Sequence, residues 1–287
     1  MGRIVYCRGG FMPENEASIG LFDRGFLFGD AVYEVTAVVN GKMIDNDLHL
    51  ARLERSLGEL DIPMPMSHQE IEAMQLRLIQ ENNLQEGTIY LQVSRGEEDR
   101  DFLYSEDLKP VLIAFTQAKT LVETKAQRDG IKVDLAEDPR WQRRDIKTVM
   151  LLAQVLAKRA AKARGFNDVW LVENGQITEG ASSTAYIVTA DKKIITRGNS
   201  HAILPGCTRQ ALLTLCDTHG YTIEERAFSP AEAQAATEAF ATSASSLVMP
   251  VVQIGEAVIG KGIPGPLTRE LQSHYLAAAG IVAQSTL

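Results

Sequence analysis

Cysteine is scarce in this chain, and so are the residues that mark fibrous or low-complexity proteins. The 287 residues include three cysteines, Cys7, Cys207 and Cys216, which are scattered and never form a Cys-x-x-Cys pair. The five histidines also lack metal-ligand spacing. These patterns predict neither a disulfide framework nor a zinc site. With 22 glycines and 10 prolines, the composition excludes collagen-like and disordered proteins.

Long apolar runs are missing as well. No segment is apolar over the length that a membrane-spanning helix needs. The N-terminal residues MGRIVYCRGG place charges and glycines where a signal peptide requires an apolar run. Tyr6 occupies the position where N-myristoylation requires Ser or Thr. We therefore expect a cytoplasmic protein with no membrane partner.

Basic residues are outnumbered by acidic ones. The chain has 29 Lys and Arg against 37 Asp and Glu, which gives a formal net charge of −8. Such a chain lacks the counter-charge that holds phosphodiester backbones, so nucleic acid is not an expected partner. A few basic groups in the right place could still bind a small anion. What remains is an ordinary globular composition, with 45% hydrophobic and 23% charged residues.

The N-terminal part of the chain is predicted to be rich in strands. Apolar and β-branched residues fill three runs, at residues 32–39, 88–94 and 111–116. The first run ends at Asn40-Gly41, a strong hairpin signal. Two helices are expected between the first and second runs. One follows Asp47, which could cap it, and the other begins with a capping box formed by Ser67 and Glu70.

The clearest predicted helix covers residues 149–164. Leu152, Val155 and Leu156 fall on one face, basic residues crowd the last turns, and Gly165 follows the end. Two hairpin turns and a helix start are expected after it, at Asn174-Gly175, Asp191-Lys192 and Ser229-Pro230.

Strands and helices mix here without strict βαβ alternation. This pattern predicts a mixed α/β (α+β) protein in two domains. A strongly apolar strand ends within residues 116–124, where a more charged stretch begins. We expect an N-terminal α/β domain over residues 1–118, an interdomain linker over 119–124 and a C-terminal domain over 125–287.

Lys147 is the first candidate for chemistry. It stands directly before the clearest helix, next to the apolar residues 149–152. Apolar surroundings lower the pKa of a lysine ammonium and make the amine available for Schiff-base formation. Without its neighbours in the sequence, the more common interpretation is a surface lysine at the flank of a helix.

Three further segments carry weaker signals. Residues 204–209 lead into a helix, where free N–H groups and the Thr208 hydroxyl could bind a phosphate; Thr208 could instead be an ordinary N-cap. The small residues 242–246 could donate further N–H groups or form a plain loop. Glu179 ends a hairpin strand, where its carboxylate could pair with a protonated ring nitrogen or remain solvated.

Six motifs follow one another along the chain in a fixed order. They lie at residues 23–34, 49–53, 90–96, 145–147, 177–180 and 204–209. In this order the sequence resembles the class IV (fold type IV) pyridoxal-phosphate aminotransferases, and most closely the D-amino-acid aminotransferases. The resemblance covers essentially the whole chain. It implies a smaller N-terminal α/β domain and a larger C-terminal domain with a strand-rich, barrel-like core.

The resemblance implies pyridoxal 5'-phosphate (PLP) as the cofactor. Lys147 would form the Schiff base and move the proton at the substrate α-carbon, while Glu179 would keep the pyridine nitrogen protonated. Arg52 resembles the phosphate-binding arginine. Thr208 and the N–H of Cys207 resemble the rest of the phosphate site.

Other positions near the cofactor follow from the same resemblance. Leu204 matches the residue packed on the ring face, and Ser182 and Ser183 match small polar positions near the cofactor. Ala244 stands where relatives can have a threonine, so the phosphate would use backbone N–H groups or Ser243 there.

The substrate side is implied by four residues. Tyr33 matches the tyrosine that faces the substrate, and Tyr90 matches it less closely. Arg100 matches the arginine that receives the substrate α-carboxylate in enzymes for D-amino acids. Two residues later the family pattern has a histidine, whereas this chain has Phe102, so the carboxylate site has one donor fewer.

We therefore expect a transaminase that moves the amino group of a D-amino acid to a 2-oxo acid by ping-pong half-reactions. D-Alanine is the expected donor and 2-oxoglutarate the expected acceptor. The enzyme is expected to be a homodimer. A branched-chain L-amino-acid transaminase, an (R)-amine transaminase and an aminodeoxychorismate lyase are alternatives on the same fold. A non-catalytic binding protein is the alternative from another class. Arg100 favours D-amino acids over the branched-chain alternative. Phe102, which replaces the histidine of the family pattern, is the main evidence against D-amino acids.

Overall fold

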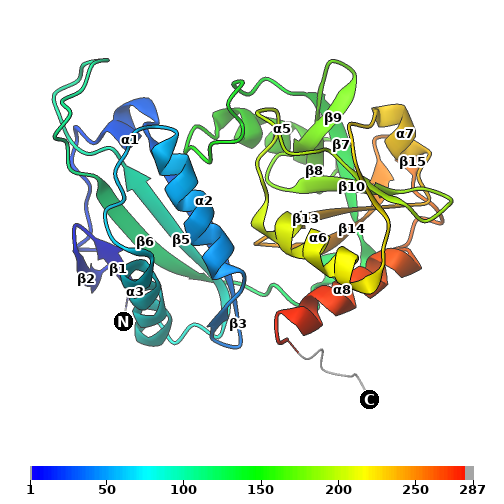
Figure 1. Cartoon of the computed structure of the whole chain (residues 1–287), viewed down its shortest axis with the longest axis horizontal. Helices are drawn as coiled ribbons and strands as arrows, with labels where there is room; N and C mark the ends of the chain where they lie inside the picture. The colour runs from blue at the N-terminus through cyan, green and yellow to red at the C-terminus, as the bar shows by residue number, and fades with distance from the viewer. Residues whose placement is uncertain (1, 282–287) are drawn as a thin grey trace. The chain divides into compact units, whose positions relative to one another are not determined.

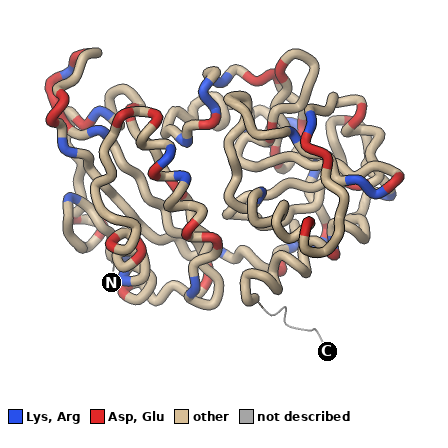
Figure 2. The backbone as a smooth tube through the Cα atoms, viewed as in Figure 1, with Lys and Arg blue, Asp and Glu red and all other residues tan. Residues whose placement is uncertain are grey.

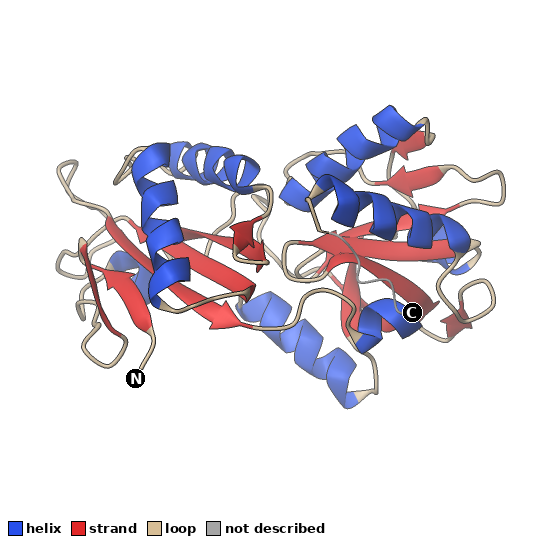
Figure 3. Cartoon of the chain, turned by 90° about the horizontal axis from the view of Figure 1, so that it is seen from below, coloured by secondary structure: helices blue, strands red, loops and turns tan. Residues whose placement is uncertain are grey.

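The computed structural model describes residues 2–281 and divides into two compact units (Figure 1). Unit 1 contains the chain up to Leu121 together with Ile146–Met150, and unit 2 contains Val122–Asp145 and the chain from Leu151 onward. Each unit has its own sheet with helices packed outside it (Figure 3). Ile146–Met150 thus groups with unit 1, although the sequence pattern places it within the C-terminal domain.

Unit 1 is built on a six-stranded antiparallel sheet in the order β2-β1-β6-β5-β3-β4. Its strands are β1 (Ile4–Cys7), β2 (Gly10–Pro13), β3 (Ala31–Val39), β4 (Lys42–Met43), β5 (Glu86–Ser94) and β6 (Val111–Ala118). Its helices are α1 (Arg24–Phe28), α2 (Asn46–Gly58) and α3 (His68–Glu81). The predicted hairpin turn is confirmed, with Asn40 and Gly41 at φ values of 53° and 70° between β3 and β4.

The core of unit 1 lies between the sheet and helices α2 and α3. Leu53 and Leu57 of α2 and Leu78 of α3 are buried against strand residues such as Leu91. The capping box of Ser67 and Glu70 is confirmed at the start of α3. The expected cap of α2 by Asp47 is wrong. That helix begins at Asn46 and takes Asp45 as its N-cap, so Asp47 lies in its first turn.

The segment Ile146–Met150 extends unit 1 through main-chain hydrogen bonds to the start of β3. The Tyr33 N–H donates to the Lys147 carbonyl at 3.0 Å, and the Val149 N–H donates to the Ala31 carbonyl at 3.1 Å. Because Thr148 forms a β-bridge with Val32 and the Val149 N–H is bonded to Ala31, the helix predicted from residue 149 begins later, as α5 (Leu152–Ala163).

Unit 2 carries a nine-stranded mixed sheet that curls into a half-barrel, in the order β12-β11-β10-β13-β14-β7-β8-β9 with β15 paired to β14 (Figure 1). Its strands are β7 (Ile131–Glu137), β8 (Asp168–Glu173), β9 (Gln176–Gly180), β10 (Thr184–Val188), β11 (Ile194–Thr196), β12 (Ile223–Glu225), β13 (Glu238–Ser243), β14 (Leu247–Ile254) and β15 (Ala257–Val258). Besides α5, its helices are α4 (Lys125–Asp129), α6 (Cys207–His219), α7 (Pro230–Gln234) and α8 (Pro266–Ala278). The mixed α/β fold predicted from the sequence is therefore confirmed.

Helix α5 has the predicted apolar face, but that face is not buried within the chain. Leu152, Val155 and Leu156 are 71%, 49% and 57% exposed. The helix instead packs on β7 and β8, with Ala161 buried. Gly165 follows its end at a φ of 88°, as the sequence predicts.

Charges of both signs alternate along the backbone of each unit (Figure 2). Across residues 2–281, none of the helices combines the length and the apolar character that crossing a lipid bilayer requires.

Candidate functional site

A buried ion cluster joins α2 to β3 in unit 1. The Arg52 guanidinium donates to both carboxylate oxygens of Glu34, from Nε at 2.8 Å and from Nη2 at 2.7 Å. His49 lies one helical turn before Arg52, and its Nδ1 is 2.7 Å from the same carboxylate. Burial by itself raises the pKa of Glu34, but the charge and hydrogen bonds of Arg52 and His49 outweigh it and lower the pKa to about 2.

Lys147 lies beside an aromatic row on the sheet of unit 1. Its Nζ is 4.1 Å from the centroid of the Tyr33 ring. Tyr33 stacks on Tyr90 with ring centroids 5.5 Å apart, and Tyr90 stacks on Phe115 at 4.9 Å. Burial raises the pKa of Tyr90, whose hydroxyl donates to Gln92 at 2.8 Å. Three residues that the sequence predicted for the site, Lys147, Tyr33 and Tyr90, are thus brought together.

Arg100 and Phe102 lie on the loop between β5 and β6, also in unit 1. The Arg100 guanidinium carbon is 5.4 Å from the centroid of the Phe28 ring and 5.7 Å from that of Phe102. Both Arg100 and Phe102 are exposed. Phe102 therefore contacts Arg100 through its ring, at the position where the family pattern has a histidine.

Glu179 of β9 is buried in unit 2 and forms part of a second ion cluster. The Arg140 Nη1 donates to its carboxylate at 2.7 Å, and the Leu204 N–H donates to it at 3.1 Å. Arg140 also donates to both oxygens of Asp138, at 2.9 and 2.7 Å. Burial raises the pKa of Glu179 above its ordinary value, although Arg140 and the Leu204 N–H act in the opposite direction.

The start of α6 has the features of an anion site. Gly206 is the N-cap and Cys207 and Thr208 are the first helical residues, so the alternative of an N-cap by Thr208 is wrong. N–H groups in a first helical turn have no acceptor within the helix and attract anions. A Cβ atom at Gly206 would lie 2.9 Å from the Thr184 hydroxyl oxygen, so this close approach requires glycine.

Two strand ends meet near that turn. Thr184 of β10 pairs with Thr242 of β13, which places Ser183 and Ser243 at the same edge of the sheet. The Ser183 hydroxyl is buried with no hydrogen-bond partner among the described residues, as expected where a bound group supplies the partner. The Ser243 hydroxyl is 2.7 Å from that of Ser246. These side chains fit a phosphate-bearing cofactor.

Ser182 and Ala244 flank the same edge of the sheet in different ways. The Ser182 hydroxyl accepts a hydrogen bond from the Lys158 Nζ at 3.1 Å. Ala244 lies in the turn between β13 and β14 and has no polar side-chain atom, so only its backbone could contact a ligand.

The sequence did not single out Glu34, His49, Asp138 or Arg140. Two of them had a signal: Glu34 lies in the Val-Tyr-Glu motif, and His49 stands one helical turn from Arg52, where both side chains share a face. No pattern marked Asp138 or Arg140. Arg140 matters to the site because it donates to Glu179, 39 residues away in the chain, and Asp138 because it binds the same arginine.

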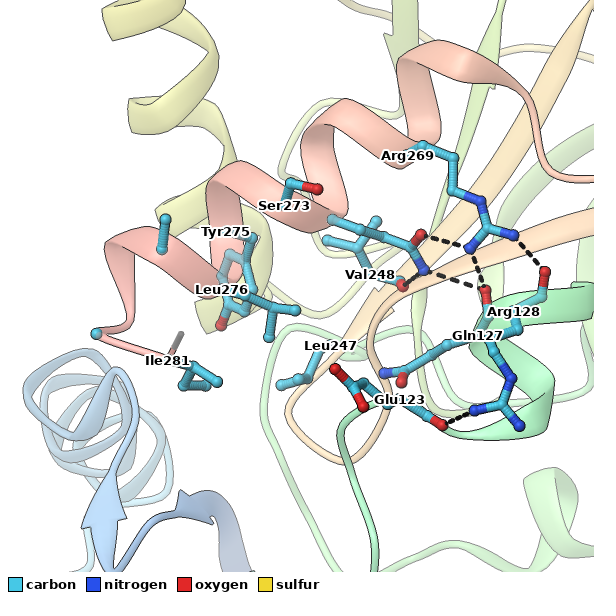
Figure 4. Close-up of a pocket in the computed structure, with 13 residues that line it drawn as sticks. Glu123, Gln127, Arg128, Leu247, Val248, Arg269, Ser273, Tyr275, Leu276 and Ile281 are labelled. Atoms are coloured by element: carbon cyan, nitrogen blue, oxygen red, sulfur yellow. Dashed lines mark hydrogen bonds between the residues drawn. The ribbon is translucent and has the colours of Figure 1, made fainter. Parts of the chain in front are cut away.

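A separate cavity of about 570 Å³ lies in unit 2, lined by residues of α4, β14 and α8 (Figure 4). One of its lining arginines, Arg269, is bonded to the protein itself, since it donates to the Gln127 carbonyl at 2.8 Å and to the Gln272 side chain at 3.0 Å. None of the predicted site residues lines this cavity.

Comparison with known proteins gives consistent matches. The family model for amino-transferase class IV matches residues 31–254. The D-alanine aminotransferase of Bacillus licheniformis is 37% identical over 94% of this chain and 94% of its own length, and that of Staphylococcus haemolyticus is 33% identical over 94% and 96%.

Solved structures agree on the fold. The branched-chain amino acid aminotransferase of Escherichia coli superposes with a TM-score of 0.90 at 19% identity, over 100% of this chain and 98% of that one. The branched-chain aminotransferase of Thermoproteus uzoniensis, solved with norvaline, superposes with a TM-score of 0.87 at 20% identity, over 98% and 96%. At these identities the likeness establishes the shared fold.

Proposed function

This chain belongs to the class IV aminotransferases, and on that premise we propose that it moves the amino group of D-alanine to 2-oxoglutarate. The broader activity, PLP-dependent transamination of D-amino acids, follows from its similarity to several D-alanine aminotransferases over nearly its whole length. The observation in the structure that best supports the proposal is the Lys147 amine beside the Tyr33 ring, in a family whose members use PLP.

When bound, PLP supplies an electron-accepting ring that stabilises negative charge at the substrate α-carbon. Lys147 binds the cofactor and moves the proton at that carbon. Its main chain is fixed by the hydrogen bonds to β3, so the position of its amine depends on four side-chain torsions alone. The Tyr33 ring, whose centroid is 4.1 Å from the Lys147 Nζ, restricts those torsions further.

Glu179 holds a proton on the ring nitrogen. Its burial excludes water, and its raised pKa makes the carboxylate a better proton acceptor than an exposed one. The Arg140 guanidinium and the Leu204 N–H fix the direction of the carboxylate. Leu204 would then have two functions, since its N–H orients Glu179 and its side chain would pack on the ring.

The phosphate would be held by Arg52, by the first N–H groups of α6 with the Thr208 hydroxyl, and by Ser243, with Ser183 a small polar side chain near the cofactor. Glu34 holds Arg52 in one orientation through two hydrogen bonds, so the direction of the guanidinium is already set when a phosphate binds. On the substrate side, Tyr33 and Tyr90 contact the donor, and Arg100 receives its carboxylate.

Absorbance of the purified enzyme tests this function. A band in the visible range that is lost on addition of D-alanine, with formation of pyruvate and without loss on addition of L-alanine, is the expected result. Loss of the band with L-leucine alone would support the branched-chain alternative, and loss with an (R)-amine alone the amine transaminase. Pyruvate formed from aminodeoxychorismate would support the lyase. A protein with no absorbance change towards any donor would be a binding protein.

We also propose that the enzyme is a homodimer in the cytoplasm. The exposed apolar face of α5, Leu152, Val155 and Leu156, is the kind of surface that a second subunit covers. All three cysteines are free and buried, which fits a reducing compartment. Light scattering of the wild type and of Leu156→Glu tests the dimer, since the charged variant is expected to shift the enzyme towards monomers. Cell fractionation tests the location.

A further inference from the structure

The loop that carries Arg100 presents its guanidinium to aromatic rings. Phe28 and Phe102 lie within 5.4 and 5.7 Å of the guanidinium carbon, and their ring centroids are 5.8 Å apart. Cations within about 6 Å of a ring centroid are attracted by the ring. Within residues 2–281, no hydrogen bond or ion pair of Arg100 is found, so its N–H groups are not committed to another side chain.

Arg24 binds the backbone that directly follows Arg100. Its side chain is 4% exposed, and it donates to the carbonyl of Asp101 at 2.8 Å and to that of Phe102 at 3.4 Å. Its Nε donates to the Asp30 carboxylate at 3.1 Å. Its guanidinium carbon is also 4.6 Å from the Phe28 ring centroid. The backbone directly after Arg100 is thus held by a buried cation.

Arg95 secures the base of the same loop. It forms two hydrogen bonds to the Asp30 carboxylate, at 2.8 and 3.1 Å, and its guanidinium carbon is 3.9 Å from the Tyr104 ring centroid. Asp30 therefore pairs with both Arg24 and Arg95. The tip of the loop is exposed, but the buried arginines Arg24 and Arg95 hold the loop in place.

An arginine that binds a carboxylate loses the conformational freedom of a side chain that otherwise samples many rotamers, and this loss weakens binding. Contacts that restrict the side chain before binding reduce that cost. Aromatic rings are suited to this purpose because they take the face of the guanidinium and leave its N–H edge to bind a carboxylate in bidentate fashion.

We infer that Phe28 and Phe102 are positioning residues that hold Arg100 ready for the carboxylate of the amino donor, on a loop that Arg24 anchors. The inference rests on the proposed function, in which Arg100 receives that carboxylate. Phe102 then compensates for the histidine that the family pattern has at its position: it orders the remaining arginine instead of supplying a second donor. Selection for donors with a carboxylate depends on this pair of rings.

Replacement of Phe102 tests the inference with little risk to the fold, since the side chain is 77% exposed. In Phe102→Leu, we expect KM for D-alanine and the inhibition constant of propionate, a carboxylate without an amino group, to rise about two- to fivefold. The kcat and the cofactor absorbance stay near those of the wild type. Phe102→Tyr keeps the ring and is expected to restore both constants.

Leu103→Ala is the matched control, because Leu103 is the neighbouring residue and is 82% exposed. It is expected to leave both constants unchanged. Arg24→Lys keeps the charge but loses the forked contacts to two carbonyls, and a rise of about tenfold in both constants is expected.

Three results would overturn the inference in different ways. If Arg100→Ala raises both constants but Phe102→Leu raises neither, Arg100 binds the carboxylate without help from the rings, and only the inference is wrong. If Arg100→Ala also leaves both constants unchanged, the proposed role of Arg100 is wrong and the inference falls with it. An equal rise in Phe102→Leu and Leu103→Ala would also contradict it, because loop disturbance would then explain the effect.

Discussion

Both units bury a carboxylate that is paired with an arginine, but the two carboxylates differ in their affinity for a proton. In unit 1, Glu34 has two partners, Arg52 and His49, and its pKa falls to about 2. In unit 2, Arg140 is shared between two carboxylates, Glu179 and Asp138. Burial therefore outweighs the remaining attraction, and the pKa of Glu179 rises.

The difference shows that the share of an arginine's charge that reaches a buried carboxylate decides what the carboxylate can do. Arg52 donates two hydrogen bonds to Glu34, which is held in its charged form and serves to orient Arg52, whereas Arg140 donates one to Glu179 and two to Asp138. An anion that must share its arginine keeps more of the proton affinity that burial confers. The first arrangement suits a structural support, and the second suits a group that holds a proton on a ring nitrogen.

The largest expected effect concerns the carboxylate of unit 2. Glu179→Gln keeps the size of the side chain but removes the charge, so we expect kcat for D-alanine to fall about 10²- to 10⁴-fold. Stability should change by less than about 1 kcal/mol, because Arg140 retains Asp138 as its partner. Steady-state kinetics and urea unfolding measure the two quantities. A large loss of stability with little loss of kcat would contradict the comparison.

The reverse pattern is expected in unit 1. Glu34→Gln leaves the buried cation Arg52 without its counter-charge, and we expect the free energy of unfolding at pH 7 to fall by about 3 kcal/mol. Urea unfolding measures this loss. Glu14→Gln is a suitable control, since Glu14 pairs with Arg3 on the exposed surface and its replacement should have a much smaller effect on stability. Equal effects in the two variants would show that the buried cluster does not act as a support.

Acid should remove the contribution of Glu34. Its pKa in the folded protein, about 2, lies below the ordinary value of 4.5, so its ionisation stabilises the fold above pH 4.5. That contribution, about 3 kcal/mol, is lost as the pH falls from 4.5 towards 2. The difference in unfolding free energy between the wild type and Glu34→Gln should therefore shrink below pH 4.5. A difference that stays constant from neutral pH down to acid unfolding would contradict the pairing.

The smallest expected effect concerns the shared arginine. The charge of Asp138 raises the pKa of Glu179. In Asp138→Asn, Arg140 pairs with Glu179 alone, and the pKa of Glu179 should fall. The acid limb of the pH profile of kcat is then expected to move to lower pH, which initial rates across a buffer series would detect. Movement to higher pH would show that Asp138 acts in another way.

Features that depend on sequence neighbours were predictable. The capping box of Ser67 and Glu70 and the turn at Asn174-Gly175, whose residues take φ values of 52° and 73°, need only a few adjacent residues. The resemblance to a family identified Arg52 and Glu179 as site residues. It did so from motifs, without showing what holds these side chains in place.

Contacts between distant segments were not predictable in the same way. The pairing of Val149 with Ala31 shortens the predicted helix, and nothing in the local sequence indicates it. The helical spacing of Leu152 and Leu156 predicted a shared face correctly, but spacing alone cannot show whether the chain itself covers that face. Arg140 was missed for the same reason, because its partner Glu179 comes from another strand.

The central claim is that the amine of Lys147 binds the aldehyde carbon of PLP. Borohydride reduction of the purified enzyme, followed by mass mapping of its peptides, tests it most directly. The expected result is a phosphopyridoxyl group on the peptide that contains Lys147, and on no peptide of the Lys147→Ala variant. A phosphopyridoxyl group on a different lysine, or a Lys147→Ala variant that remains coloured and fully active, would contradict the account.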